Sequence, residues 1–170
     1  MKIDSNKIQK FEIFNDLNND DIQLFSKKMQ FKSYSKNDII MQEGDDGHSL
    51  LFLLNGEINI TKALTLSTNK NNDDDNREKE FIRCKSKYNI IIGEVSLFSE
   101  DSKRTATVKA LTDCEIAYLE REDFFKICND NPSIGYKAIN NLTKIITKRL
   151  IDTNYQVLKL TTAFSLIVDN

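Results

Sequence analysis

The chain has 170 residues, of which 39% are hydrophobic, and a formal net charge of −2 at pH 7. This length fits one domain plus an appendage, and the near-balanced charge lacks the basic footprint of a nucleic-acid-binding protein. With His48 as its single histidine, the chain cannot build a His-rich metal site or most histidine-based nucleophile systems.

The cysteines and the apolar runs point to a cytoplasmic protein. Cys84, Cys114 and Cys128 are odd in number, lie far apart and include no C-x-x-C pair, so we expect reduced thiols. The opening segment MKIDSNKIQK lacks the apolar stretch of a signal peptide. The apolar run at residues 163–168 is far too short to span a bilayer, so no membrane partner is expected.

Residues 1–30 are predicted to form an N-terminal helical segment. Asn19 and Asp20 are the candidate N-caps of its main helix. An apolar stripe runs along the segment through Phe14, Leu17, Ile22, Leu24, Phe25 and Met29.

From residue 31 to residue 120 the pattern changes to short strands separated by turn residues, which is typical of an all-β sandwich or barrel. Strands are predicted at residues 39–41, 50–54, 57–61, 81–84, 90–92, 104–110 and 114–119, within a set of about eight. The strand at 50–54 is apolar throughout, so we expect it to be buried on both faces. Asn55 and Gly56 predict a type I′ hairpin between the strands that flank them.

Residues 64–80 interrupt the strands. The stretch TLSTNKNNDDDNREKE is rich in Asn and Asp and has no hydrophobic period, so it is interpreted as a long solvated loop. Asp73, Asp74 and Asp75 offer a metal-binding alternative. They are consecutive, however, and no glutamate closes a loop as in an EF-hand.

The stretch GEVSLFSEDSKRTATVKA, residues 93–110, carries the chemistry of the chain. Arg104 shares its strand parity with Ala106, Val108 and Ala110, so its guanidinium should point inward. A buried cation needs an anionic partner, and an arginine beside free helix N–H groups suits a phosphate. Glu94 would repel a plain phosphate but can accept a hydrogen bond from a hydroxyl. The residues therefore describe a nucleotide whose ribose and phosphate lie close together.

Residues 121–170 are predicted to be helical. A short helix at 121–130 is followed by Asn131 as an N-cap and Pro132 at the first position of a long helix that reaches residue 167. At ~1.5 Å per residue this helix would be on the order of 50 Å long, so it must project from the β domain and pair with a second copy. The alternative is a break near Asp152 that folds the helix back. The heptad seam consists of Ile146, Leu150, Thr153, Val157, Leu160, Phe164 and Ile167.

These stretches resemble the cyclic nucleotide-binding domain family, to which the catabolite activator proteins belong. IIMQEGDDGHSLLFLLNGEINI resembles the family's pattern of strands and turns through Gly44, Asp45, Gly47 and Gly56. Residues 93–110 resemble its phosphate-binding cassette, and residues 131–160 resemble the activators' dimerisation helix. The resemblance implies an α+β fold: an eight-stranded antiparallel β jelly roll with N-terminal helices and a long C-terminal dimerisation helix.

The resemblance also implies roles for the cassette residues. Glu94 would hold the ribose 2′-hydroxyl, and Arg104 would hold the exocyclic phosphate oxygens. Gly93 would permit a close approach of the backbone. The backbone N–H groups of Val95 and Ser96, together with the Ser96 hydroxyl, would assist the arginine.

Three further residues match positions that face the base. Thr105 lies where the family places a base or phosphate contact, and Thr153 and Asn154 match the helix positions that reach the purine. Thr153 has an alternative role in setting the register of a coiled coil. The chain departs from the family at Tyr88 and Asn89, where Gly-Asp is common, although Asn tolerates left-handed backbone geometry.

The sequence therefore predicts a cytoplasmic, non-enzymatic sensor that binds cAMP in preference to cGMP, needs no cofactor and acts as a homodimer on an unknown effector protein. The chain ends about 70 residues before an activator's DNA-binding segment would be complete. One alternative is thus a truncated transcription regulator. Another is a degenerate, ligand-free interaction module in which Glu94 and Arg104 pair with each other. A cupin-like enzyme would need several histidines.

Overall fold

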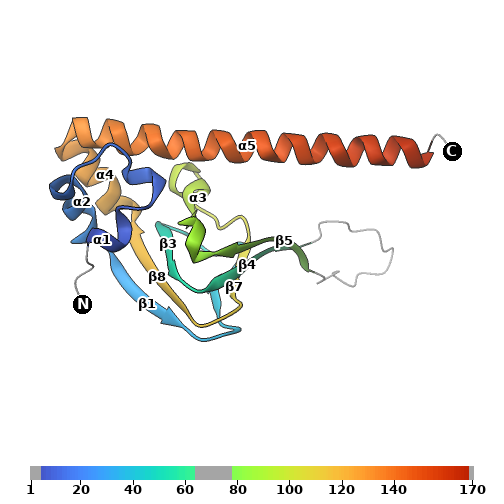
Figure 1. Ribbon diagram of the computed structural model, residues 1–170, viewed down its shortest axis with the longest axis horizontal. Helices are drawn as coiled ribbons and strands as arrows, with labels where there is room; N and C mark the ends of the chain where they lie inside the picture. The colour runs from blue at the N-terminus through green and yellow to red at the C-terminus, as the bar shows by residue number, and fades with distance from the viewer. Residues whose placement is uncertain (1–4, 64–77, 169–170) are drawn as a thin grey trace.

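Two β-sheets lie beside one long helix in the computed structural model, which describes residues 5–63 and 78–168 (Figure 1). The helices are α1 (Ser5–Ile8), η1 (Glu12–Phe14), α2 (Asn19–Ser26), η2 (Ser86–Tyr88), α3 (Glu94–Phe98), α4 (Arg121–Asp130) and α5 (Pro132–Val168). The strands are β1 (Gln30–Tyr34), β2 (Ile39–Met41), β3 (Ser49–Asn55), β4 (Glu57–Ala63), β5 (Glu78–Lys85), β6 (Ile91–Ile92), β7 (Thr107–Ala110) and β8 (Cys114–Glu120).

Each sheet contains four antiparallel strands, in the orders β1-β8-β3-β6 and β2-β7-β4-β5. Side chains of β3 alternate between two cores. Leu51 and Leu53 lie in the cluster between the sheets, whereas Leu50 and Phe52 lie in the cluster under the helices. This alternation confirms that β3 is buried on both faces. Together with the helices at either end, it confirms the predicted α+β jelly roll.

The turn at Asn55 and Gly56 is not the predicted type I′ hairpin. β3 and β4 belong to different sheets, so the chain crosses here from one sheet to the other. Gly56 has φ +94°, but Asn55 has no positive φ, and a type I′ turn requires one at both residues. A side chain at Gly56 would also collide with Asp113 and Cys114 at the start of β8. The dipeptide signals a sharp turn but cannot say whether the flanking strands pair.

The N-terminal helices pack on β3 through aromatic rings. Phe11 and Phe14 lie 5.2 and 5.8 Å from the Phe52 ring, measured between ring centroids. The N-cap of α2 is Asn18 and not the predicted Asn19 or Asp20. Asn18 Oδ1 accepts from the Asp21 backbone N–H at 2.9 Å, and the Asp21 carboxylate accepts in return, which forms a capping box.

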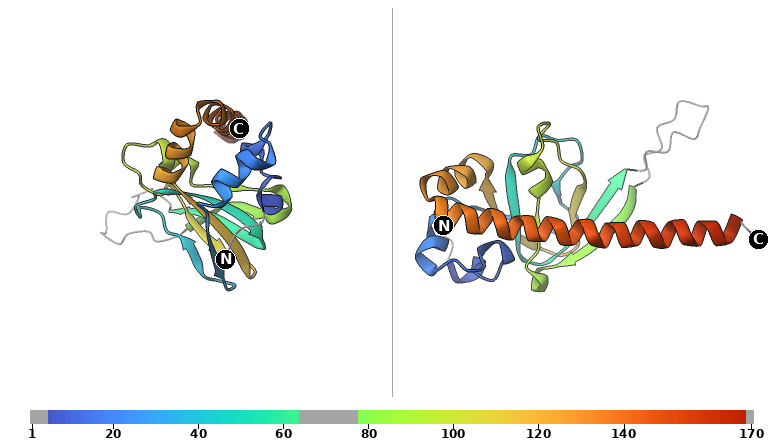
Figure 2. Two further views of the ribbon diagram at one scale, coloured as in Figure 1. Left: turned by 90° about the vertical axis from the view of Figure 1, so that its left-hand side faces the viewer. Right: turned by 90° about the horizontal axis from the view of Figure 1, so that it is seen from above.

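α5 is one unbroken helix of 37 residues, as predicted, without a break near Asp152. Its buried residues, from Gly135 to Ile145, all lie in the first half. There Asn141 Nδ2 donates to the backbone carbonyls of Ile13 and Asn15. Residues 150–168 are exposed throughout, and Figure 2 shows this half extending beyond the sheets. The pairing of its apolar seam with a second copy stays a prediction.

β5 begins at Glu78, so the last residues of the predicted 64–80 loop belong to a strand. Residues 64–77, which include the alternative metal ligands Asp73, Asp74 and Asp75, lie outside the described residues. Within the described ranges, no helix combines the length and the apolar character needed to cross a membrane.

Candidate functional site

A cavity of about 480 Å³ opens between sheet β2-β7-β4-β5, α3 and α5. This volume is typical of a site for a small molecule. No group of three or more His, Cys, Asp or Glu side chains in residues 5–63 and 78–168 could hold a metal ion. The apolar wall includes Met41, Ile60, Ile82, Cys84 and Ile92, and the polar wall includes Gly93, Glu94, Ser96, Arg104, Thr105, Arg149, Asp152, Thr153 and Gln156.

Arg104 is held in a fixed position at the edge of this cavity. Its Nη1 donates to the Ser49 carbonyl at 3.0 Å and to Ser96 Oγ at 2.9 Å, while Nη2 donates to Ser49 Oγ at 3.0 Å. Gly47 and Gly93 make room for it, because a Cβ at either position would collide with the Arg104 side chain. We call Gly47, Ser49, Gly93 and Ser96 the Arg104 seat.

The partners of Arg104 are all neutral. Its side chain is buried, with 8% of the residue exposed, and no carboxylate of the described residues lies within ion-pair distance. Burial lowers the pKa of Arg104 from its ordinary value, although an arginine keeps its charge in proteins. A guanidinium has five N–H donors, and the three bonds to the seat leave others for a ligand. The inward orientation predicted from strand parity is confirmed.

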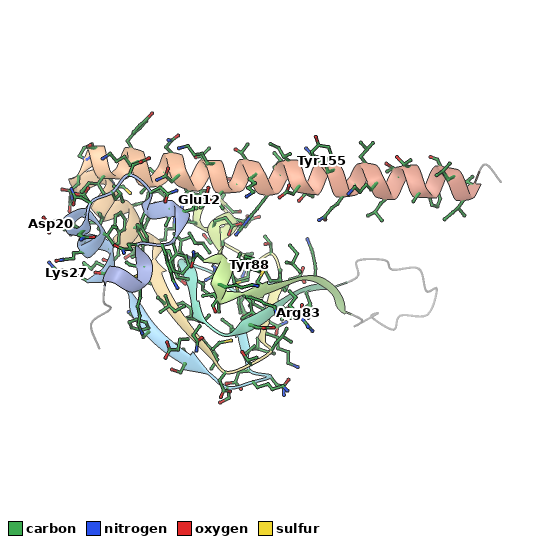
Figure 3. The ribbon with its side chains drawn as sticks, in the orientation of Figure 1. Glu12, Asp20, Lys27, Arg83, Tyr88 and Tyr155 are labelled. Carbon is green, nitrogen blue, oxygen red and sulfur yellow. The ribbon has the colours of Figure 1, made fainter. Side chains whose placement is uncertain are left out.

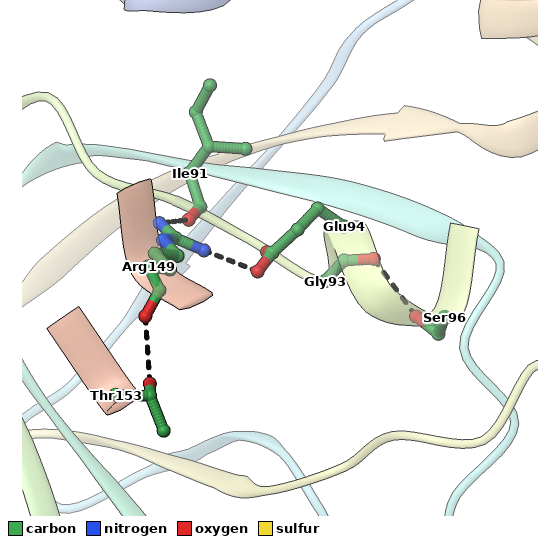
Figure 4. A network of polar contacts seen from close by, with 6 residues as sticks. All are labelled: Ile91, Gly93, Glu94, Ser96, Arg149 and Thr153. Atoms are coloured by element: carbon green, nitrogen blue, oxygen red, sulfur yellow. Dashed lines mark hydrogen bonds and ion pairs between the residues drawn. The ribbon is translucent and has the colours of Figure 1, made fainter. Parts of the chain in front are cut away.

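Glu94 binds Arg149 of α5 and not Arg104 (Figure 4). Glu94 Oε1 accepts from Arg149 Nη1 at 2.5 Å, and Arg149 Nη2 also donates to the Ile91 carbonyl at 2.7 Å. The predicted alternative of an internal Glu94–Arg104 pair is therefore wrong. The carboxylate stays at the cavity wall, and its contact links the cassette to the long helix.

α3 begins at Glu94 because Gly93 adopts a left-handed conformation, with φ +86°. The strand β6 can therefore turn directly into a helix whose first N–H groups, including those of Val95 and Ser96, have no intrahelical acceptor. Ser96 is buried. Its hydroxyl donates to the Gly93 carbonyl at 3.0 Å and accepts from Arg104, so in this structure it positions the arginine.

The strand after the cassette is shorter than predicted. β7 begins at Thr107, whereas the pattern placed its start at Arg104. Thr105 is exposed and lines the cavity, as expected for a ligand contact. Thr107 breaks the predicted alternation, because it is buried and its Oγ1 accepts from the Glu43 backbone N–H at 3.1 Å. A turn from another strand covers that face, and parity within one strand cannot reveal such a cover.

One face of α5 completes the cavity. Arg149, Asp152, Thr153 and Gln156 line it, and they share a face because they are three or four residues apart. The Thr153 hydroxyl donates to the Arg149 carbonyl at 2.8 Å. Asn154, predicted to reach the purine, is exposed and is not part of the cavity wall of this chain.

The structure thus brings together seven of the eight predicted site residues: Gly93, Glu94, Val95, Ser96, Arg104, Thr105 and Thr153. Sequence reasoning missed Arg149, Asp152 and Gln156. The sequence pattern that could have identified them is their successive spacing of three and four residues around Thr153, which places them on one polar face of the helix beside the apolar seam. Asn89, at the departure from the family pattern, adopts the left-handed conformation that its residue type tolerates, with φ 50°.

The family model of the cyclic nucleotide-binding domain matches residues 31–131, more than half of the chain. The chain belongs to the cyclic nucleotide-binding domain family. The match contains Glu94 and Arg104 and ends before α5, so it does not cover Arg149 or Thr153.

Among curated relatives, the cAMP-activated global transcriptional regulator CRP of Haemophilus influenzae is 29% identical to this cyclic nucleotide-binding domain over 127 residues. The aligned part covers 75% of this chain and 50% of the relative. The chain therefore spans about half the length of the curated relatives that it matches.

Solved structures give the same fold. A cyclic nucleotide-binding domain from Methylobacillus flagellatus superimposes with a TM-score of 0.74 at 23% identity, covering 90% of this chain and 79% of that chain. The regulatory domain of Toxoplasma gondii PKA, co-crystallised with cAMP, superimposes with a TM-score of 0.59 at 25% identity, covering 72% and 42%.

Proposed function

We propose that this chain is a cyclic nucleotide sensor without catalytic activity, which binds cAMP in preference to cGMP and acts in the cytoplasm. The observation that carries this proposal is Arg104, a buried cation with neutral partners that borders a cavity of ligand size. A cyclic phosphate would supply the missing negative charge. Glu94, on the same wall, would accept from the ribose 2′-hydroxyl.

The base would extend from the ribose toward the apolar side chains of β4 and β5. There it would meet Thr153 of α5, whose hydroxyl can serve as donor or acceptor. The CRP relatives are named as cAMP-activated, and the Toxoplasma gondii domain was crystallised with cAMP, which supports adenine as the base. Asp152 on the cavity wall favours cGMP as the second candidate, because a carboxylate accepts from the adjacent N1–H and amino groups of guanine.

The signal would leave the cavity through α5. Ligand binding at Glu94 would act on the same carboxylate that holds Arg149, and occupancy would thereby be linked to the position of the helix. The exposed seam from Leu150 to Ile167 supports a homodimer through α5, which light scattering of the purified chain would test. In such a dimer Asn154, exposed on its own subunit, could face the cavity of the partner. The downstream effector would be another protein.

The decisive experiment is isothermal titration with cAMP and cGMP, with linear AMP as the ligand control. We expect saturable binding of a cyclic nucleotide and its loss in Arg104→Ala. The matched control is Arg83→Ala, because Arg83 is an exposed arginine on β5 (Figure 3) that does not line the cavity. An absence of heat and of thermal stabilisation with both nucleotides would support the ligand-free interaction module instead. A shift of labelled DNA would revive the transcription regulator.

A further inference from the structure

The orientation of Arg104 depends on two chain segments that must stay in register, one of which carries Gly47 and Ser49 of the Arg104 seat. Gly47 and Ser49 belong to the segment that enters β3, whereas the loop after α3 leads to Arg104 itself. The two segments pair through their backbones. Arg104 N–H donates to the Asp45 carbonyl at 2.8 Å, and Gly47 N–H donates to the Ser102 carbonyl at 2.7 Å.

Ser102 is the point where the loop bends back toward the seat. It has φ +49°, which a non-glycine residue adopts only at some cost, and just 9% of the residue is exposed. A strained residue keeps its conformation only where its surroundings hold it. The backbone N–H of Ser102 donates to the Ser99 carbonyl at 3.4 Å, and its carbonyl accepts from Gly47, so Ser102 needs side-chain partners beyond these two backbone bonds.

Arg121, the first residue of α4, contacts both segments. Its side-chain Nη1 donates to Ser102 Oγ at 3.1 Å, and its backbone N–H donates to the His48 carbonyl at 2.6 Å, next to Ser49. The Arg121 guanidinium lies over the ring of Phe125, 5.8 Å from the ring centroid, which restricts its orientation.

Phe125 adds a second link between α4 and the cassette. Its ring meets the Phe98 ring of α3 edge-on, with 5.8 Å between the centroids. α4 therefore touches the loop between Phe98 and Ser102 at both ends. Because α4 is followed by α5 after Asn131 alone, a displacement of the C-terminal helices would act on this loop directly.

We propose that Arg121 is a positioning residue for the phosphate-binding arginine. It holds the loop at Ser102 in register with Gly47 and Ser49, and so keeps Arg104 in the orientation that receives a cyclic phosphate. The position of α4 thereby sets the affinity for the phosphate part of the ligand. This inference rests on the proposed function, since it concerns the same cavity, but Arg121 does not line that cavity.

The test combines two readouts. The first is the ¹⁵N NMR signal of the Arg104 Nε–H in the ligand-free protein, assigned by its absence in Arg104→Lys. We expect Arg121→Gln and Ser102→Ala to shift this signal and to speed its hydrogen exchange. Arg83→Gln, which alters an exposed arginine outside the cavity, should leave it unchanged.

The second readout is cAMP affinity by titration. Arg121→Gln and Ser102→Ala should each weaken binding about tenfold, as expected for one hydrogen bond from a charged donor, and the double variant should be no weaker than either. Arg121→Lys, which keeps a donor, should restore part of the affinity.

Two outcomes would overturn the proposal: an unchanged Arg104 signal in Arg121→Gln, or additive losses in the double variant. If the wild-type chain binds no nucleotide while the Arg104 signal still responds to Arg121→Gln, the proposed function fails but the positioning role stands.

Discussion

Arg104 and Arg149 line the same cavity from different elements, yet their charges are satisfied in different ways. Arg104 is 8% exposed, and serine and backbone oxygens hold it. Arg149 has a side chain that is 40% exposed, and it meets the carboxylate of Glu94. The first cation forms no ion pair within the described residues, although the charge of Glu120 acts on it from a greater distance, whereas the second is paired with a carboxylate.

This difference between the two arginines suggests that one binds the ligand and the other connects the cavity to α5. A buried cation with neutral partners costs folding free energy, and a ligand anion can recover that cost. The Glu94–Arg149 pair, which joins a buried carboxylate to a half-exposed arginine, contributes little net stability, but it fixes the geometry of both groups, and removing the cation alone would leave the carboxylate unpaired. We therefore infer that Arg104 provides affinity, while Arg149 connects the ribose side of the cavity to α5.

The largest effect is expected from Arg104→Met. Cyclic nucleotide affinity should fall at least about 100-fold, which equals roughly 2.7 kcal/mol, because the phosphate loses its charged donor. The ligand-free protein should stay within about 1 kcal/mol of wild type in urea, because removal of a buried charge offsets the loss of its three hydrogen bonds to the seat. Titration and urea unfolding measure the two quantities. A large loss of ligand-free stability would show that Arg104 serves the fold and would break the comparison.

A smaller and opposite pattern is expected from Arg149→Met. Glu94 would keep its buried position without its cation, so urea unfolding should show a loss of about 1–2 kcal/mol in the ligand-free protein. Affinity should fall about tenfold, because the ribose acceptor is no longer oriented. Adding Glu94→Gln to this variant should recover stability but not affinity. Equal stability of Arg149→Met and wild type would argue against a linking role.

The smallest effect is expected from Asp152→Asn. This variant tests whether α5 contributes to the choice of base as well as holding Glu94 through Arg149. Guanine presents two adjacent donors to a carboxylate, so the change should lower cGMP affinity about threefold to tenfold and leave cAMP affinity within about twofold. Competition titration gives the ratio. Lys159→Gln, which alters a charged α5 residue outside the cavity, is the control. An unchanged ratio would limit the role of α5 to Arg149 and Thr153.

Local patterns predicted much of this site because its chemistry is concentrated in one stretch. Period-two alternation placed Arg104 on the inner side, and that orientation holds although the strand begins three residues later. The heptad seam and Pro132 predicted one continuous helix, and the helix is continuous. These predictions succeeded because the deciding interactions lie within a few residues along the chain.

Local patterns failed where a distant segment decides. Asn55 and Gly56 turn between sheets and not within one, because β3 pairs with β8 and β6 while β4 pairs with β7 and β5. Thr107 was predicted to lie on the outer face of its strand. It is buried because the turn before β3 covers that face. The residues adjacent in sequence to these positions give no indication of either tertiary contact.

The sequence by itself determined an all-β sandwich or barrel, the inward arginine and the long helix, since backbone geometry and hydrophobic period specify them locally, while the jelly roll followed from the family resemblance. Only the tertiary structure decided which groups meet the charges. Glu94 and Arg149 are 55 residues apart, and so are Ser49 and Arg104. The choice of partner at such separations depends on which backbones pack together. In this fold Glu94 pairs with Arg149 of α5, whereas Arg104 is hydrogen-bonded only to neutral groups beside the cavity.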